Sequence, residues 1–92
     1  RILALEMGGN NPLVAWDVAD IEAAAATVVQ SAFLSAGQRC TNARRLIVRD
    51  ERLVEAVLAL SDRLIIGGPF DEPQPFMGPV ISNAAADGLE RG

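Results

Sequence analysis

The sequence predicts an α/β fold, because strand-like and helix-like patterns alternate along a chain of 92 residues. Two short apolar stretches open the chain, and an alanine-rich helical pattern follows them. A third strand-like stretch leads into a second helical pattern, and a proline-rich loop leads into a third. The expected order is therefore strand, strand, helix, strand, helix, loop and helix.

The first two predicted strands flank a turn. Residues 2–7 are mostly apolar and alternate weakly, which predicts a short buried strand. The glycines and asparagines of residues 8–12 are typical of a turn, and Pro12 favours an extended conformation for the residue before it. Residues 13–16 predict the second strand.

The clearest predicted element is a helix over residues 20–36. Asp17 or Asp20 can cap its N-terminus, and Gly37 is the residue type expected just past its C-terminus. Few charges lie beyond its first turn, so we expect a packed interior helix. Its apolar face consists of Ile21, Ala25, Val28, Ala32 and Ala36, with Val29 and Phe33 beside them.

The second half of the chain predicts one more strand and two more helices. Residues 44–49 form the strand, and Asp50 can cap a helix that ends at residues 66–69. The apolar face of that helix consists of Leu53, Val57, Leu60 and Leu64, with Val54, Leu58 and Ile65 beside them. Ser82 or the residue after it starts the last helix, which Gly88 is expected to end.

The composition argues against several classes of protein. A net charge of −4 argues against a nucleic-acid or anionic-membrane binder, and no apolar run reaches the ~20 residues that span a bilayer. One cysteine and no histidine leave no internal disulfide and no usual zinc ligand set, so we expect no metal site and a cytoplasmic setting. Hydrophobic residues make up 50% of a chain that opens on Arg1, so we expect a section of a longer protein.

Cys40, the only cysteine, is the candidate nucleophile. A thiol attacks as its thiolate, which a neighbouring cation or a polar loop at a helix end favours. Arg39 supplies the cation, and Gly37 supplies the break in the helix. The alternative is that Cys40 is a small buried hydrophobic residue, as lone cysteines often are.

Glu6 is the candidate base, because it is the one charged side chain in the first predicted strand. Burying a carboxylate is unfavourable unless the group is paired or is used in catalysis. The alternative is an ordinary exposed glutamate at the end of a strand.

Three motifs occur in an order and spacing that a known family shares. They are Leu5-Glu6-Met7-Gly8-Gly9-Asn10-Asn11-Pro12, Gly37-Gln38-Arg39-Cys40, and Gly78-Pro79-Val80-Ile81-Ser82. Together they resemble the central part of an aldehyde dehydrogenase. Residues 10–14, 35–41 and 43–46 are similar to the N-succinylglutamate 5-semialdehyde dehydrogenases of arginine breakdown.

The resemblance implies NAD(P)-dependent oxidation of an aldehyde to a carboxylate. Cys40 would form a thiohemiacetal, whose oxyanion would accept hydrogen bonds from the Cys40 N–H and from an asparagine outside this chain. Hydride transfer would leave a thioester, and Glu6 would activate the water that hydrolyses it. Gly8 and Gly9 would let the backbone pass close to the nicotinamide. The implied substrate is N-succinylglutamate 5-semialdehyde.

The resemblance also implies a division of the chain. Residues 1–9 would be the tail of a nucleotide-binding domain, and residues 10–92 would be the N-terminal part of the catalytic domain. The whole protein would be a homo-oligomer that acts on a small-molecule aldehyde with NAD as cofactor. The sequence does not decide between NAD and NADP, because the segment that contacts the ribose lies outside it.

Three points stay open: the role of Arg39, the acceptor of the acyl group, and whether the chain is part of an enzyme at all. Arg39 would bind a carboxylate of the substrate, favour the thiolate, or point away, since neighbours in sequence need not share a face. A CoA-acylating relative would transfer the acyl group to CoA and would not require Glu6 as a base. Finally, the chain would be a structural or interaction module in which Cys40 is merely buried.

The isolated chain of 92 residues is expected to show no dehydrogenase activity, because nearly all of the implied cofactor site lies outside it. An absorbance assay for reduced cofactor, with aldehyde and NAD in excess, checks this. Reduced cofactor formed in proportion to the added chain would contradict the expectation.

Overall fold

The computed structural model describes residues 1–92 and has a mixed α/β architecture, as the sequence predicts. It contains two strands, three α-helices and one short 3₁₀ helix. In chain order these are β1 (Asn11–Ala15), α1 (Ile21–Phe33), η1 (Leu34–Gly37), β2 (Ala43–Val48), α2 (Glu51–Asp62) and α3 (Asn83–Arg91).

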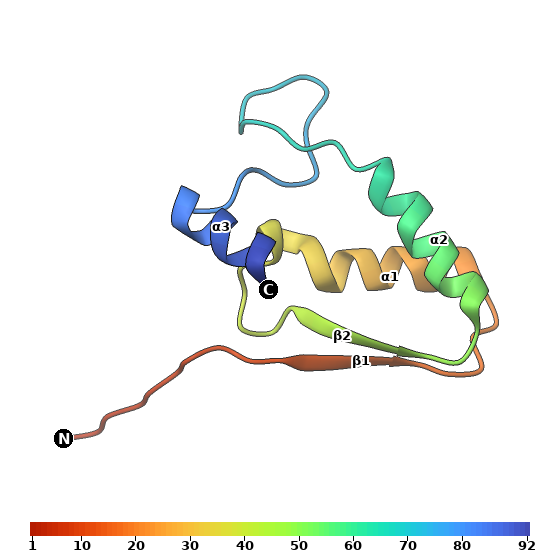
Figure 1. The fold of residues 1–92 in the computed structure, drawn as a ribbon, viewed down its shortest axis with the longest axis horizontal. Coiled ribbons are helices and arrows are strands. Elements are labelled where there is room, and N and C mark those ends of the chain that lie inside the picture. Colours follow the sequence, from red (N-terminus) through yellow and green to blue (C-terminus); the bar gives the residue numbers. More distant parts are fainter.

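Strands β1 and β2 form a parallel two-stranded sheet that α1 connects (Figure 1). Parallel strands need a crossover connection, so β1, α1 and β2 make up a βαβ unit. Asn11 lies opposite Ala43 and Ala15 lies opposite Val48, with an irregularity in register between Asn11 and Pro12. Pro12 has no N–H to donate to the ladder, which suits it to this irregular position.

The core lies between α1 and α2, which pack together on one side of the sheet (Figure 1). Ala25 and Val29 of α1 are each 2% exposed, and Leu53 of α2 is fully buried. These residues lie on the apolar faces that the sequence predicts. The opposite side of α1 is exposed, so the prediction of an interior helix holds for one face only.

Each α-helix begins at a side-chain cap that the sequence predicts. A side-chain oxygen accepts a main-chain N–H of the first turn in every case: Asp20 from Ala23, Asp50 from Arg52, and Ser82 from Ala85. These bonds satisfy N–H groups that have no partner within the helix. The local sequence therefore fixes where all three helices start.

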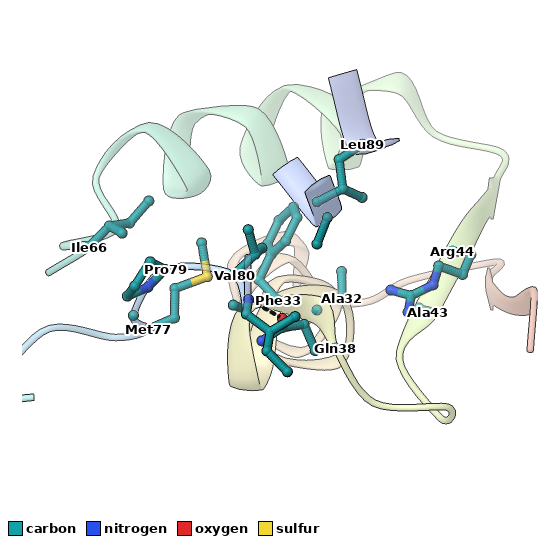
Figure 2. A pocket seen from close by; sticks show the side chains of 15 residues that line it. Ala32, Phe33, Gln38, Ala43, Arg44, Ile66, Met77, Pro79, Val80 and Leu89 are labelled. Atoms are coloured by element: carbon teal, nitrogen blue, oxygen red, sulfur yellow. Dashed lines mark hydrogen bonds between the residues drawn. The ribbon is translucent and has the colours of Figure 1, made fainter. Parts of the chain in front are cut away.

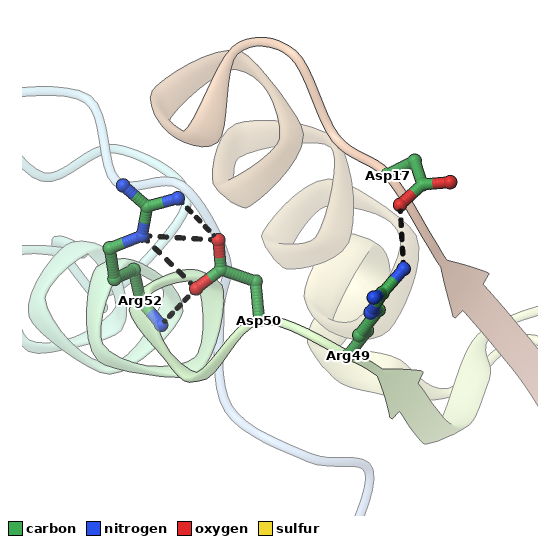
Figure 3. A network of polar contacts seen from close by, with 4 residues as sticks. All are labelled: Asp17, Arg49, Asp50 and Arg52. Atoms are coloured by element: carbon green, nitrogen blue, oxygen red, sulfur yellow. Dashed lines mark hydrogen bonds and ion pairs between the residues drawn. The ribbon is translucent and has the colours of Figure 1, made fainter.

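Two exposed ion pairs lie near the ends of the strands (Figure 3). Arg49 pairs with Asp17 at 3.2 Å, and Arg52 pairs with Asp50 at 2.6 Å. The hydrogen bonds from Arg52 lower the pKa of Asp50 below its ordinary value and raise the pKa of Arg52. Exposed pairs of this kind contribute little to stability, because water and salt screen them.

The ends of two helices differ from the predictions. Helix α2 ends at Asp62, before the glycines of residues 66–69, and there the N–H groups of Arg63 and Leu64 bond the carbonyl oxygens three residues back, at 3.1 and 3.2 Å. Helix α3 continues through Gly88 to Arg91, since one glycine costs only about 1 kcal/mol in a helix relative to alanine. None of the three helices is long and apolar enough to cross a membrane.

The predicted strand at residues 2–7 is wrong. Residues 1–10 form no strand or turn, and Ile2 and Met7 are 97% and 93% exposed. A strand needs a neighbour that accepts its hydrogen bonds, and neither β1 nor β2 pairs with this segment. Residues 1–10, called the N-terminal arm below, instead run outward from the start of β1 to the N-terminus (Figure 1), while Gly9 and Asn10, next to β1, still lie against the rest of the chain. Gly8, in the predicted turn, does have a positive φ of 91°.

Leu53→Ala is expected to destabilise the protein by about 2–5 kcal/mol, because the substitution leaves a cavity in the packed core. The midpoint of urea unfolding measures the change. Glu55→Ala is the control on the same helix, and it should change stability far less because the Glu55 side chain is charged and exposed. Equal losses for the two variants would contradict the assignment of the core.

Candidate active site

Cys40 lies in the loop between η1 and β2, and it is free and exposed. The structure therefore contradicts the interpretation of Cys40 as a buried hydrophobic residue. An exposed thiol at the end of a helix is accessible to an electrophile from solvent.

A left-handed turn precedes the cysteine loop. Ser35 and Ala36 have φ values of 58° and 57°, and Gly37 follows with a φ of 70°. For this reason α1 ends at Phe33, and the prediction of a helix through residue 36 is wrong. Left-handed backbone costs roughly 1–2 kcal/mol at each residue that carries a Cβ, so other contacts must hold this turn.

Asn42 supplies such contacts from a buried position. It is 4% exposed, and its Oδ1 accepts the Arg39 N–H at 2.6 Å. Its Nδ2 donates to the carbonyl oxygens of Ser31 and Leu34 at 2.9 and 3.3 Å. Asn42 is not among the residues that the sequence predicts for the site, and its one signal there is a polar amide between the cysteine and an apolar strand.

Asn11 joins the start of β1 to the cysteine loop. Its Nδ2 donates to the carbonyl oxygens of Cys40 and Asn42 at 2.5 and 3.1 Å. Gly9 lies close by, since a Cβ added there would meet the Cys40 carbonyl oxygen at 3.1 Å. The motif that contains Glu6 and the motif that contains Cys40 are thus in contact through Gly9 and Asn11.

The other predicted site residues lie around this contact. Glu6 is in the exposed N-terminal arm, and its side chain makes no hydrogen bond or ion pair, including any with Cys40. Gly8 has open space beside it, because no atom lies within 4 Å of a Cβ built there. Arg39 is exposed, and its Nε donates to the Ser35 hydroxyl oxygen at 3.0 Å.

A large, mostly apolar hollow lies between the C-terminal end of α1 and helix α3 (Figure 2). It is bounded by the end of α1, the loop before α3, and α3 itself, and neither Cys40 nor Glu6 lines it. Gln38 and Arg44 are the polar side chains in its lining, and Gln38 Oε1 accepts the Ile81 N–H at 2.8 Å. No three His, Cys, Asp or Glu side chains gather in the structure where they could hold a metal ion.

The sequence matches the Aldehyde dehydrogenase family over residues 1–92. It is 64% identical over 92 residues to the N-succinylglutamate 5-semialdehyde dehydrogenase of Sphingopyxis alaskensis, covering 97% of this chain and 19% of the relative. It is 66% identical over 90 residues to N-succinylglutamate 5-semialdehyde dehydrogenase 1 of Caulobacter vibrioides, covering 94% of this chain and 19% of the relative. The chain thus spans about a fifth of the length of these relatives.

The fold is similar to parts of solved structures. An NAD-dependent aldehyde dehydrogenase from Sinorhizobium meliloti matches with a TM-score of 0.84 and 31% identity, over 94% of this chain and 18% of that protein. A 1-pyrroline-5-carboxylate dehydrogenase from Thermus with bound NAD matches with a TM-score of 0.75 and 38% identity, over 86% of this chain and 16% of that protein.

Proposed function

The chain belongs to the aldehyde dehydrogenase family, and from this premise we propose that the full-length protein oxidises an aldehyde to a carboxylate with a nicotinamide cofactor. The observation that carries the proposal is that the loop of the exposed Cys40 lies against Gly9, in the motif that contains Glu6. We propose N-succinylglutamate 5-semialdehyde as the substrate, because the curated relatives described above are named for it.

Cys40 is the proposed nucleophile. Its thiolate adds to the carbonyl carbon, which forms a C–S bond and turns the carbonyl oxygen into an oxyanion. The main-chain N–H of Cys40 makes no hydrogen bond within the chain, so it is free to donate to that oxyanion. NAD or NADP, when bound, supplies the acceptor for the hydride that leaves the thiohemiacetal carbon, which becomes a thioester.

Glu6 is the proposed base for hydrolysis of the thioester. It takes one proton from water as the water oxygen bonds to the acyl carbon, and the C–S bond then breaks to release the Cys40 thiolate and the carboxylic acid, which loses its remaining proton to solvent to become the carboxylate. The Glu6 carboxylate is exposed and unpaired within this chain, as in the alternative interpretation, so its proposed role rests on its place in the family motif and on the contact between Gly9 and the Cys40 loop. Gly8 supports the role, because a glycine with positive φ lets the arm bend toward Cys40 at little steric cost.

The backbone at Gly8 is open to an incoming group. No atom lies within 4 Å of a Cβ built at Gly8, and a Cβ built at Gly9 would crowd the Cys40 carbonyl oxygen at 3.1 Å. We therefore propose that part of the nicotinamide lies beside Gly8. Residues 1–9 would then be the tail of a nucleotide-binding domain and residues 10–92 the start of the catalytic domain, with most cofactor contacts made by residues outside the chain.

Removal of the nucleophile and removal of the base should have different effects. In the full-length protein, Cys40→Ala is expected to lower kcat by roughly 10³-fold or more, because no thioester forms. Glu6→Gln is expected to release one burst of reduced cofactor and then to turn over about 10²–10⁴-fold more slowly. Stopped-flow absorbance and mass spectrometry of the peptide that contains Cys40 measure the burst and the trapped acyl group.

The control is Glu55→Gln, which replaces an exposed carboxylate on α2 and should leave turnover unchanged. Undiminished turnover of Glu6→Gln would contradict the role of Glu6. Turnover that instead depends on added CoA would favour a CoA-acylating enzyme.

Arg39 is the proposed partner of a substrate carboxylate, because its exposed guanidinium is held only by a bond to Ser35. Arg39→Ala is expected to raise KM about tenfold or more for N-succinylglutamate 5-semialdehyde, which carries two carboxylates, and to leave KM for propanal unchanged. Steady-state kinetics with both aldehydes measure this, with Arg63→Ala as the control. The same change for both aldehydes, or none for either, would contradict the proposed contact.

A further inference from the structure

We propose that Asn42 is a positioning residue, whose buried side chain and main-chain N–H fix the peptides around Cys40 in the geometry for attack. Asn11 helps by binding the peptide that follows Cys40. This inference rests on the proposed role of Cys40 as nucleophile. It assigns no chemical step to Asn42, which acts only through the backbone that it binds.

The Asn42 side chain bridges the two ends of the left-handed turn. Its Nδ2 binds the Leu34 carbonyl where the turn begins, and its Oδ1 binds the Arg39 N–H just after the turn. Between these points Ser35 and Ala36 have positive φ, which is unfavourable for residues with a Cβ. A single buried amide thus holds a strained segment that leads directly to Cys40.

The main chain of Asn42 fixes the peptide that contains the Cys40 N–H. The Asn42 N–H donates to the Arg39 carbonyl oxygen at 3.2 Å, and Arg44 Nη2 donates to the same oxygen at 3.3 Å. In a trans peptide the C=O and the N–H point in opposite directions. The Cys40 N–H therefore points away from these donors, which leaves it available to an oxyanion.

Asn11 fixes the next peptide. Its Nδ2 donates to the Cys40 carbonyl oxygen at 2.5 Å, so the peptides before and after the cysteine are both held. The same Nδ2 also donates to the Asn42 carbonyl oxygen at 3.1 Å, which couples the two asparagines. Small errors in the position of a reacting atom can cost about 10²-fold in rate, so this hold matters for catalysis.

The test compares two substitutions that each remove a cap of α1 in the full-length protein. Asn42→Ala removes contacts at its C-terminal end beside Cys40, and Asp20→Ala removes the cap at its N-terminal end. We expect Asn42→Ala to slow the first turnover about 10- to 100-fold, with KM for NAD unchanged. We expect Asp20→Ala to lower the unfolding temperature while the first turnover stays within twofold.

Hydrogen exchange gives a readout other than activity. The peptide that spans residues 37–42 should exchange at least about tenfold faster in Asn42→Ala and at the unsubstituted rate in Asp20→Ala, because only the first variant frees the Arg39 N–H. Asn42→Asp keeps the acceptor for that N–H but puts a carboxylate oxygen against two carbonyls. It should therefore fail to restore the rate, and a restored rate would overturn the proposal.

A folded Asn42→Ala variant whose first turnover is within twofold of the unsubstituted protein overturns the proposal. If Asn42→Ala does not fold, Asn11→Ala decides, since Asn11 is only partly buried. That variant should slow the first turnover about threefold to tenfold, and an unchanged rate overturns the proposal. Activity retained in Cys40→Ala would instead refute the proposed nucleophile, so the two failures are distinguishable.

Discussion

The side-chain amide of Asn42 is the contact on which the geometry around Cys40 depends. Main-chain groups that leave a helix lose their regular partners, and in a buried position they need replacements. Asn42 provides them from one side chain, because an amide can donate and accept at the same time. The chain can therefore leave α1, pass through a left-handed turn and enter β2 within a few residues.

Parallel pairing of the two strands explains why the two family motifs meet. Asn11 lies opposite Ala43, so the segments that precede β1 and β2 emerge at the same end of the sheet. Gly9 belongs to one of these segments and Cys40 to the other, which brings residues far apart in sequence into contact. Helix α1 crosses over from the end of β1 to the start of β2. Its C-terminal end leads through η1 into the cysteine loop (Figure 1).

Much of the apolar surface has no partner within this chain. Hydrophobic residues make up 50% of the sequence, yet only 5 of the 92 residues are buried. The N-terminal arm and the hollow beside α3 account for a large part of the exposed apolar side chains. This distribution agrees with our proposal that these 92 residues pack against further parts of a longer enzyme.

The sequence by itself determined the elements whose signals are local. The caps at Asp20, Asp50 and Ser82, and the spacing of apolar residues in α1 and α2, depend on contacts within one or two turns. The family motifs likewise identified Cys40 and Glu6 as candidates. The cap and spacing signals do not depend on the rest of the structure, because the interacting groups are neighbours along the chain.

Tertiary structure alone decided the features that need a distant partner. The arm did not become a strand, because a strand's hydrogen bonds come from another segment. The left-handed turn at Ser35 and Ala36 runs against local preference, and it forms where Asn42 bonds both of its ends. The sequence likewise did not predict the hydrogen bond from Asn11 to the Cys40 carbonyl oxygen, because Asn11 approaches the cysteine only after the strands have paired.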